Sequence, residues 1–528
     1  MKRLLLGLMA FSGLALSAGT LRDYVAAFNA EDEELYTNAV CNAQAADFLE
    51  RNVPTFTCPD MDIERTYYFR WWTYRKHLKQ TSDGWVVTEF LPNVGWAGKH
   101  NTISCPLGHH LREGRWLKDS TFLDDYIRFM VTQGSVNGTR AYACWPAWAA
   151  LERAKVTGDF DYARRLLGEF VKNWDVWAKG WKMRNGHMAG LRADRGLFDF
   201  LGDREGTECA LSKDGARPMV NAAMWAEATA IAKIAKDVGD AALAANFAKR
   251  AADLERSIQE RLWNTRRNFF TTLDYDGKLD DVCELHGYAP FYFRMPQPAG
   301  RLAAWDGLMD EKGFFAPVGI VFPRRDTPGF NVTIDYTKHE CLWDGPTWPY
   351  ATSVTLTALY ETLQEGAHPA KATAKDFAKL VGQYARAQVL VREDGKRVPW
   401  IDENQHPFTG LWIARDVLVE QARRRGKPVK YRERGKDYNH STFCDLVIAG
   451  LCGVVPQEGD GLAVRPLAPV EWDWFKVAGV RYHGRDLSVV WDRSGERFGK
   501  GKGLSVWIDG REIARTTELK PLEKITVK

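Results

Sequence analysis

The chain has 528 residues, of which 45% are hydrophobic and 27% charged, and its formal net charge is +4. This composition is typical of a globular protein, and the length allows at least one large domain. So small a net charge favours neither a nucleic-acid partner nor a membrane surface. The 21 tryptophans are many for this length. They suit stacking on sugar rings as well as burial in a core.

The N-terminus has the pattern of a secretory signal peptide. Lys2 and Arg3 precede an apolar run over residues 4–16, and small residues follow at 15–19. We therefore predict a signal peptide over 1–19 and a periplasmic or secreted protein. The run is short for a membrane span and no later stretch of the sequence is long enough, so no membrane span is predicted.

Nine cysteines are scattered along the chain without a Cys-x-x-Cys pair. The sequence also has no phosphate loop, dinucleotide fingerprint or cluster of metal ligands, so we predict no cofactor and no metal. The odd number leaves at least one thiol unpaired. The sequence settles neither the disulfide pairing nor the oligomeric state.

The first part of the chain mixes helices with an extended region. A short helical segment over 20–52 is followed by an aromatic, basic helix from Glu64. Alternation predicts a strand over 85–91, and the polar stretch 93–116 has few helix signals and is predicted to be a loop. Three helices follow, over the ranges 119–133, 140–156 and 159–181.

Helical hairpins dominate the middle of the chain. Residues 219–238 and 241–263 form the clearest pair, joined at Gly239-Asp240. The pattern continues with helices over 302–309, 347–364, 370–388, 410–425 and 439–451. Short loops alternate with long ones, which predicts stacked α-hairpins closed into a toroid with its long loops at one mouth.

The tail has a different pattern from about residue 455. Alternating segments over 487–491, 504–508 and 512–516, with a turn at Asp509-Gly510, predict a small β appendage. The predicted organisation is thus mainly α: a signal peptide over 1–19, a helical catalytic domain with its N-terminal segment over 20–455, and a β-rich extension over 456–528.

Three loops rich in side-chain chemistry stand before helices. The first, 202–212, carries Glu205 and Glu208. The second, 343–350, is rich in aromatic residues, and the third, 400–410, carries Asp402 and Glu403. A toroid would bring such loops together, and loops held by a rigid scaffold are where enzymes place reacting groups.

These loops resemble those of a known group. Trp343-x-Gly-Pro-x-Trp-Pro and Glu403-Asn404-x-x-Pro-x-Thr-Gly are similar to the pattern of (α/α)6-barrel inverting glycoside hydrolases, the group of trehalase, processing α-glucosidase I and mannosylglycerate hydrolase. The resemblance runs through most of residues 64–455 and is specific only in the three loops. It implies an (α/α)6 toroid and an exo-acting glycosidase that cleaves a terminal α-linked sugar with inversion. Its partner would be a carbohydrate, and no cofactor is implied.

The resemblance also implies catalytic roles. In the group the general acid lies in a Glu-Ser-Gly-x-Asp loop, so Glu208 matches the acid and Glu403 the base, with Glu205 and Asp402 as alternates. Glu208 departs from the pattern because the group has Asp there. Inversion requires one protonated and one ionised carboxyl, and the nearby charge of Glu205 would favour a protonated Glu208. The non-catalytic interpretation is that Glu205 and Glu208 cap the following helix and pair with an arginine.

Substrate contacts are predicted with less support from the pattern. The aromatic loop of the group lines its pocket, which implies sugar contacts for Trp343, Asp344 and Trp348. The other wall is assigned to polar and aromatic residues elsewhere in the chain, namely Arg70, Trp96, His110 and His440. A structural role is an alternative for each of them.

Two other functions remain open. A polysaccharide lyase on a helical toroid would need a base and a cation, for which Tyr438, His440 and Arg434 are available. A non-catalytic glycan-binding protein would also explain the tryptophan content. The sequence does not identify the sugar, the linkage or the aglycone.

Overall fold

The computed structural model describes residues 19–134, 138–426 and 434–527. The predicted signal peptide therefore lies outside the described residues except for Gly19. Within the described ranges, we find no helix that is both long enough and apolar enough to cross a membrane.

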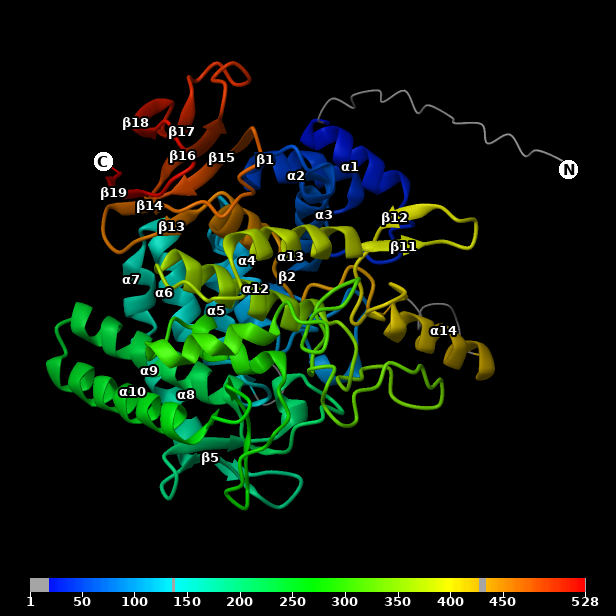
Figure 1. The fold of residues 1–528 in the computed structure, drawn as a ribbon, viewed down its shortest axis with the longest axis vertical. Helices are drawn as coiled ribbons and strands as arrows, with labels where there is room; N and C mark the ends of the chain where they lie inside the picture. The colour runs from blue at the N-terminus through cyan, green and yellow to red at the C-terminus, as the bar shows by residue number, and fades with distance from the viewer. Residues whose placement is uncertain (1–18, 135–137, 427–433, 528) are drawn as a thin grey trace, which may run out of the picture.

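The described chain is mainly helical (Figure 1). The α-helices are α1 (Leu21–Ala30), α2 (Ala45–Asn52), α3 (Met61–His77), α4 (Leu107–Gly114), α5 (Thr121–Thr132), α6 (Pro146–Thr157), α7 (Phe160–Arg165), α8 (Leu167–Lys179), α9 (Pro218–Asp237), α10 (Ala241–Arg261), α11 (Ala289–Tyr292), α12 (Pro349–Gln364), α13 (Ala374–Ala387) and α14 (Ile413–Arg424).

The helices form an inner and an outer set. Helix α9 is rich in alanine and is buried on nearly every face of its first four turns, whereas α10 buries one narrow stripe. The same contrast separates α12 from α13. Small side chains let α9 pack closely on several neighbours at once, and an amphipathic helix can cover it on the solvent side. Asp240 begins α10 by accepting a hydrogen bond from the Leu243 amide at 2.9 Å.

Two sequence predictions differ from the structure. The predicted loop 93–116 contains helix α4, whose residues are all buried, including its charged ones. The segment carries two glycines and two histidines, which are weak helix formers, and the packing around it stabilises the helix despite them. The predicted helix 439–451 is helical only near its end, where Leu446–Leu451 forms a π-helical turn. The residues before this turn instead form hydrogen bonds with other elements.

Buried ion pairs hold this part of the chain in place. Asp445 accepts hydrogen bonds from Arg112 Nε at 2.9 Å and Arg115 Nε at 3.0 Å, both near the end of α4. The Tyr360 hydroxyl of α12 also donates to Asp445, at 2.7 Å. Buried charges are tolerated only when they are paired in this way. The network fixes α4, α12 and the π-helical turn against one another.

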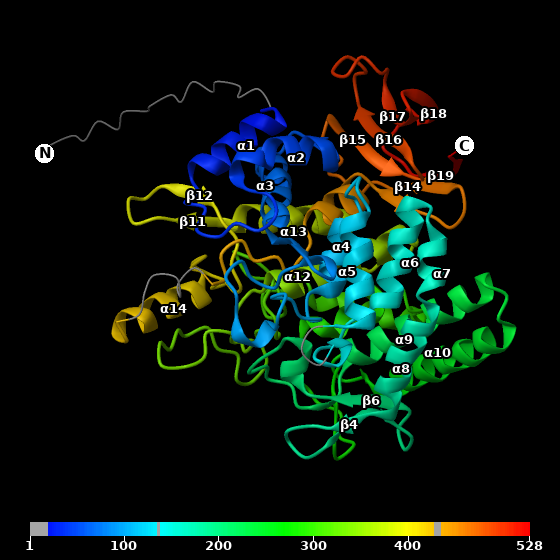
Figure 2. The ribbon, with the colours of Figure 1, turned by 180° about the vertical axis from the view of Figure 1, so that it is seen from behind.

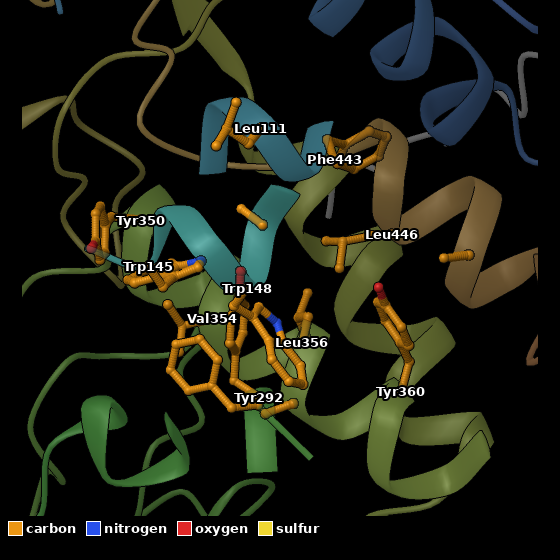
Figure 3. Packing of buried hydrophobic residues seen from close by; sticks show 14 of the residues in the cluster. Leu111, Trp145, Trp148, Tyr292, Tyr350, Val354, Leu356, Tyr360, Phe443 and Leu446 are labelled. Carbon is orange, nitrogen blue, oxygen red and sulfur yellow. The ribbon is translucent and has the colours of Figure 1, made fainter. Parts of the chain in front are cut away.

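The apolar core fills the space between these helices. Figure 3 shows Trp145, Trp148 and Tyr292 gathered there, and the rings of Trp145 and Tyr292 are 5.6 Å apart. Gly108 of α4 permits this packing, because a Cβ at this position would lie 2.0 Å from Trp145 Cε2. No residue with a side chain fits there without moving the indole.

The strands are short and form several separate sheets. They are β1 (Thr55–Thr57), β2 (Leu78–Thr81), β3 (Gly84–Val87), β4 (Trp181–Lys182), β5 (Met188–Arg192), β6 (Leu197–Phe200), β7 (Gly215–Ala216), β8 (Trp263–Asn264), β9 (Phe269–Phe270), β10 (Leu273–Asp274), β11 (Val389–Val391), β12 (Arg397–Pro399), β13 (Val454–Pro456), β14 (Gly461–Val464), β15 (Trp474–Tyr482), β16 (Arg485–Asp492), β17 (Gly503–Ile508), β18 (Arg511–Thr516) and β19 (Leu522–Thr526).

The C-terminal strands form the predicted β region. Strands β15–β18 make an antiparallel meander, and β13, β14 and β19 make a second sheet. The N-terminal strand β1 adds to the edge of the meander, with Phe56 opposite Val477. Residues from the two ends of the chain therefore share one sheet, which no local pattern indicates.

A second five-stranded sheet lies at the opposite end of the molecule. Its order is β10-β7-β6-β5-β4, and it is built mainly between α8 and α9 (Figure 2). The loop that carries Glu205 and Glu208 follows β6 directly. The sheet and the start of α9 thus fix both ends of that loop.

Candidate active site

The three predicted loops meet around one cavity of about 280 Å³. The Trp343 amide donates to the Glu208 carbonyl at 3.1 Å, which joins the second loop to the first. Thr347 and Gln405 exchange backbone hydrogen bonds of 3.0 and 2.9 Å, which joins the second loop to the third. Each loop contributes side chains to the lining, among them Glu208, Trp343 and Glu403.

Glu208 is held in a setting that favours its protonated form. Burial raises the pKa of its carboxyl to about 7, and the negative charge of Glu403 adds to the rise. Gly206 turns the chain into the cavity with a φ of 73°. A Cβ on Gly206 would lie 2.8 Å from the Cys105 sulfur, so a side chain there would be both strained and crowded. A carboxyl protonated near neutral pH can act as a general acid.

Glu403 is surrounded by hydrogen-bond donors. Arg434 Nη2 donates to its Oε1 at 2.6 Å, and the Cys341 thiol donates to its Oε2 at 2.7 Å. Arg434 also binds Glu340 through Nη1 at 2.5 Å. The carboxylate is thus fixed in position by contacts to both of its oxygens, as a general base requires.

A third carboxyl in the cavity, Glu89, was not among the sequence predictions. Its Oε2 accepts a hydrogen bond from Trp96 Nε1 at 2.9 Å. Burial raises the pKa of Glu89 to about 8, and the charges of Glu403 and Glu208 contribute to the rise. Glu89 follows a strand in an ordinary-looking stretch with no motif around it. Only the tertiary structure brings it to the cavity.

Aromatic rings form much of the wall. Trp343 and Trp348 are stacked, with their centroids 3.9 Å apart and their planes 7° from parallel. Elsewhere in the lining, His440 lies against Tyr438 at 4.4 Å and Phe90 at 5.5 Å. Flat apolar faces beside carboxyl groups are the features that bind a sugar ring.

The two alternate carboxylates are placed differently from Glu208 and Glu403. Glu205 is buried outside the cavity lining, where its Oε2 accepts from Arg217 Nε at 2.7 Å and its Oε1 from the Val220 amide at 2.8 Å. Burial opposes ionisation, but the charges and hydrogen bonds of Arg217 and His286 together outweigh it and hold the pKa of Glu205 below its usual value. Glu205 therefore matches the non-catalytic interpretation of a helix-capping, arginine-paired residue. Asp402 is fully buried, and its Oδ1 accepts from the Glu403 amide at 2.8 Å.

Only some of the predicted substrate-binding residues reach the cavity. Trp343, Trp348, Trp96 and His440 line the cavity, and Arg70, His110 and Asp344 do not. Arg70 donates to Ser441 Oγ at 2.9 Å inside the core. His110 is also fully buried, with its Nδ1 3.1 Å from the Tyr126 hydroxyl. Asp344 instead points to Asn331.

One group in the cavity wall has the composition of a metal site. His339, Glu340 and Cys341 bring potential ligand atoms within 4.8 Å of one another. Arg434 contacts two of these atoms, Glu340 Oε1 at 2.5 Å and Cys341 Sγ at 3.6 Å. The guanidinium therefore supplies the positive charge at this position. All nine cysteines lie in the described part of the chain and are free thiols.

Comparisons with known proteins match both regions of the chain. A family model described as the mannosylglycerate hydrolase MGH1-like glycoside hydrolase domain matches residues 99–193 and 183–441. Another, described as the C-terminal domain of glycosyl hydrolase family 65, matches residues 457–515.

The chain also resembles solved structures. A structure described as a sialidase is 32% identical with a TM-score of 0.83, covering 94% of this chain and 44% of that one. A family 78 rhamnosidase of Bacillus sp. GL1 is 14% identical with a TM-score of 0.53, covering 86% of this chain and 41% of that one, and shows a shared fold. The chain thus spans less than half the length of either protein.

Proposed function

Because this chain belongs to the family of mannosylglycerate hydrolase MGH1-like glycoside hydrolases, we propose that it removes a terminal α-linked sugar from a glycan with inversion at the anomeric carbon. The observation that carries this proposal is that Glu208 and Glu403 line the same aromatic cavity. Burial and the Glu403 charge raise the pKa of Glu208, and Arg434 binds Glu403. One protonated and one ionised carboxyl are the two groups that an inverting glycosidase needs.

The proposed reaction needs only these two groups and a water molecule. The terminal sugar lies against Trp343 with its glycosidic oxygen towards Glu208. Glu208 transfers its proton to that oxygen as the bond to the anomeric carbon breaks. Glu403 takes a proton from a water molecule, which attacks the anomeric carbon from the opposite face. The protons on the two carboxyls are exchanged with solvent before the next turnover.

The same proposal extends to the fold and to the location of the protein. The inner and outer helices would form an (α/α)6 toroid over 20–455, with the three loops at its mouth and the β-rich extension over 456–528 packed beside it. The N-terminal pattern of Lys2, Arg3 and the apolar run supports export to the periplasm or the medium.

The lyase alternative has weaker support from the same cavity. Burial raises the pKa of the Tyr438 phenol well above its usual value, which makes it a poor base. Arg434 is already bound to Glu340 and Glu403, so its charge is not available to neutralise a uronate. A lyase would also release a product with a new double bond, which absorbs in the ultraviolet.

A panel of glycosides tests the proposal. We would assay α-D-mannosides, α-D-glucosides and α-L-rhamnosides, each as a p-nitrophenyl glycoside and as a disaccharide. p-Nitrophenolate leaves without a proton, so Glu208→Gln should lose disaccharide hydrolysis far more than p-nitrophenyl hydrolysis. Glu403→Gln should lose both, because the attacking water needs its base in either case.

The matched control is Glu260→Gln, at an exposed position on α10. It removes the same charge and should leave both activities unchanged. Near-normal disaccharide hydrolysis by Glu208→Gln and Glu403→Gln would contradict the proposal.

A further inference from the structure

A second cavity of about 250 Å³ lies beside the first and has the opposite charge. Four of its lining residues are cationic, namely Arg140, Lys182, Arg184 and Arg204, and none is acidic. The indole of Trp181 also lines it, and the Arg140 guanidinium lies 5.9 Å from the centre of that ring. The site combines positive charge with a flat apolar face.

The positive charge of this cavity is largely uncompensated. Arg184 pairs with Asp203 at 2.5 Å. Among the described residues, no carboxylate lies within ion-pair distance of Arg140, Lys182 or Arg204. Cations gathered without counter-charges repel one another, so an anion bound between them would be stabilised.

The basic cavity is adjacent to the candidate active site. The ring of Tyr142 lines the first cavity, and the Arg204 guanidinium of the second lies 5.4 Å from the centre of that ring. The Ala143 amide also donates to the Arg204 carbonyl at 3.0 Å. Arg204 and Glu208 are four residues apart in one loop, so this loop places its charges in two neighbouring cavities.

The first cavity is lined by more acidic than basic side chains. It is lined by four carboxyl groups, those of Glu89, Glu208, Glu340 and Glu403, and by a single arginine, Arg434. An anionic sugar there would lie close to Glu340 and Glu403, whose two charges a single arginine, Arg434, offsets only in part. The terminal sugar that suits this cavity is therefore neutral, and an acidic group suits only the second cavity.

We propose that the basic cavity binds a carboxylate or sulfate group on the part of the glycan beyond the scissile bond, while a neutral terminal sugar occupies the first cavity. This proposal depends on the glycosidase function proposed above. It assigns the substrate class as an acidic glycan that ends in a neutral sugar. Arg140 and Lys182 would bind the anion, and Trp181 would stack on the ring that bears it.

Binding of three trisaccharides to the full chain tests this inference. We would titrate three trisaccharides with a neutral terminal glucose by calorimetry at low and high salt: maltosyl glucuronate, maltotriose sulfated only on its reducing-end unit, and maltotriose. The maltosyl glucuronate or the sulfated maltotriose should bind at least about tenfold more tightly than maltotriose, with an affinity that falls as salt rises. The tighter of the two identifies the anion as carboxylate or sulfate.

Two pairs of substitutions test where the anionic trisaccharide binds. Arg140→Ala/Lys182→Ala should abolish the preference for the anionic trisaccharide. The control pair Lys179→Ala/Arg261→Ala removes the same charge from exposed positions outside the cavity and should keep the preference. Equal binding of all three trisaccharides, or equal loss in both pairs of variants, would overturn the inference.

The outcomes separate this inference from the glycosidase proposal. Cleavage of neutral glycosides without any preference for anionic trisaccharides would refute the basic site alone. Binding of an anionic trisaccharide without hydrolysis of any glycoside would refute the glycosidase function and leave an anion-binding site.

Discussion

Arg434 donates two hydrogen bonds to one oxygen of Glu403, from Nη2 at 2.6 Å and from Nε at 3.3 Å. The Cys341 thiol holds the other oxygen at 2.7 Å. Both oxygens of the proposed base are thus fixed by neighbouring side chains. Arg434 acts on the reaction through Glu403 and is a positioning residue.

Replacing Arg434 should therefore affect kcat more than KM. Arg434→Met removes the donors and leaves Glu403 free to move, and displacement of a reacting group by about 1 Å costs up to about 100-fold in rate. Arg434→Lys should recover part of the loss, because it restores a single charged donor. The check is steady-state kinetics on the best substrate, with Arg261→Met as control. A rise in KM at unchanged kcat would instead indicate that Arg434 binds the substrate.

The pH profile should report the protonation of Glu208. A general acid is active when protonated, and the pKa of Glu208 is raised to about 7 by burial and by Glu403. We expect kcat/KM for a disaccharide to fall as pH increases through about 7. The same decline should persist in Glu89→Gln, because glutamine mimics the protonated form of Glu89, with a loss within about tenfold. If Glu89→Gln is as inactive as Glu208→Gln, Glu89 is the acid.

Glu205 should contribute to stability rather than to chemistry. Glu205→Gln removes the nearer carboxylate of the buried Arg217, at 2.7 Å, and leaves only Glu284 at 3.3 Å. Removing one partner of a buried ion pair costs about 3–5 kcal/mol in free energy of unfolding. Chemical denaturation should show this loss, whereas the folded variant should keep far more activity than Glu208→Gln. Full stability together with complete inactivity would mean that Glu205 is the acid.

Glu227 should make the free energy of unfolding decrease as pH rises. Burial raises the pKa of its carboxyl to about 8 in the folded protein, against a usual value of 4.5. Between these values the folded state holds a proton that the unfolded state has lost, so the free energy of unfolding falls as pH rises from about 4.5 to 8.

Glu227→Gln should reduce this pH dependence, because glutamine cannot ionise. The measurement is Tm between pH 5 and 8 for the wild type, Glu227→Gln and the exposed control Glu260→Gln. The control should follow the wild type. A slope of Tm against pH that is unchanged in Glu227→Gln would show that Glu227 does not carry this dependence.

The sequence predicted the groups that lie in motifs. Glu208, Trp343, Trp348 and Glu403 stand in loops whose residue types are unusual together, and all four line one cavity. The hairpin of α9 and α10 was also predicted nearly to its ends, because Gly239-Asp240 separates two strongly helical segments.

Residues placed by long-range contacts were harder to predict. Glu89 reaches the cavity only through tertiary packing, and Arg140 joins Lys182 and Arg204 only where the loop after β6 folds back. Arg70 looked available for a substrate because it stands in an aromatic, basic segment. It is instead buried against Ser441, which is 371 residues away in the chain.

The stereochemistry of hydrolysis tests the central claim most directly. We would follow cleavage of the best glycoside from the panel by proton NMR in its first minutes, before the released sugar mutarotates. If Glu208 is the acid and Glu403 activates water, an α-glycoside should release the β-anomer first. Release of the α-anomer first would mean retention through a covalent intermediate and would contradict the assignment of Glu403 as a general base.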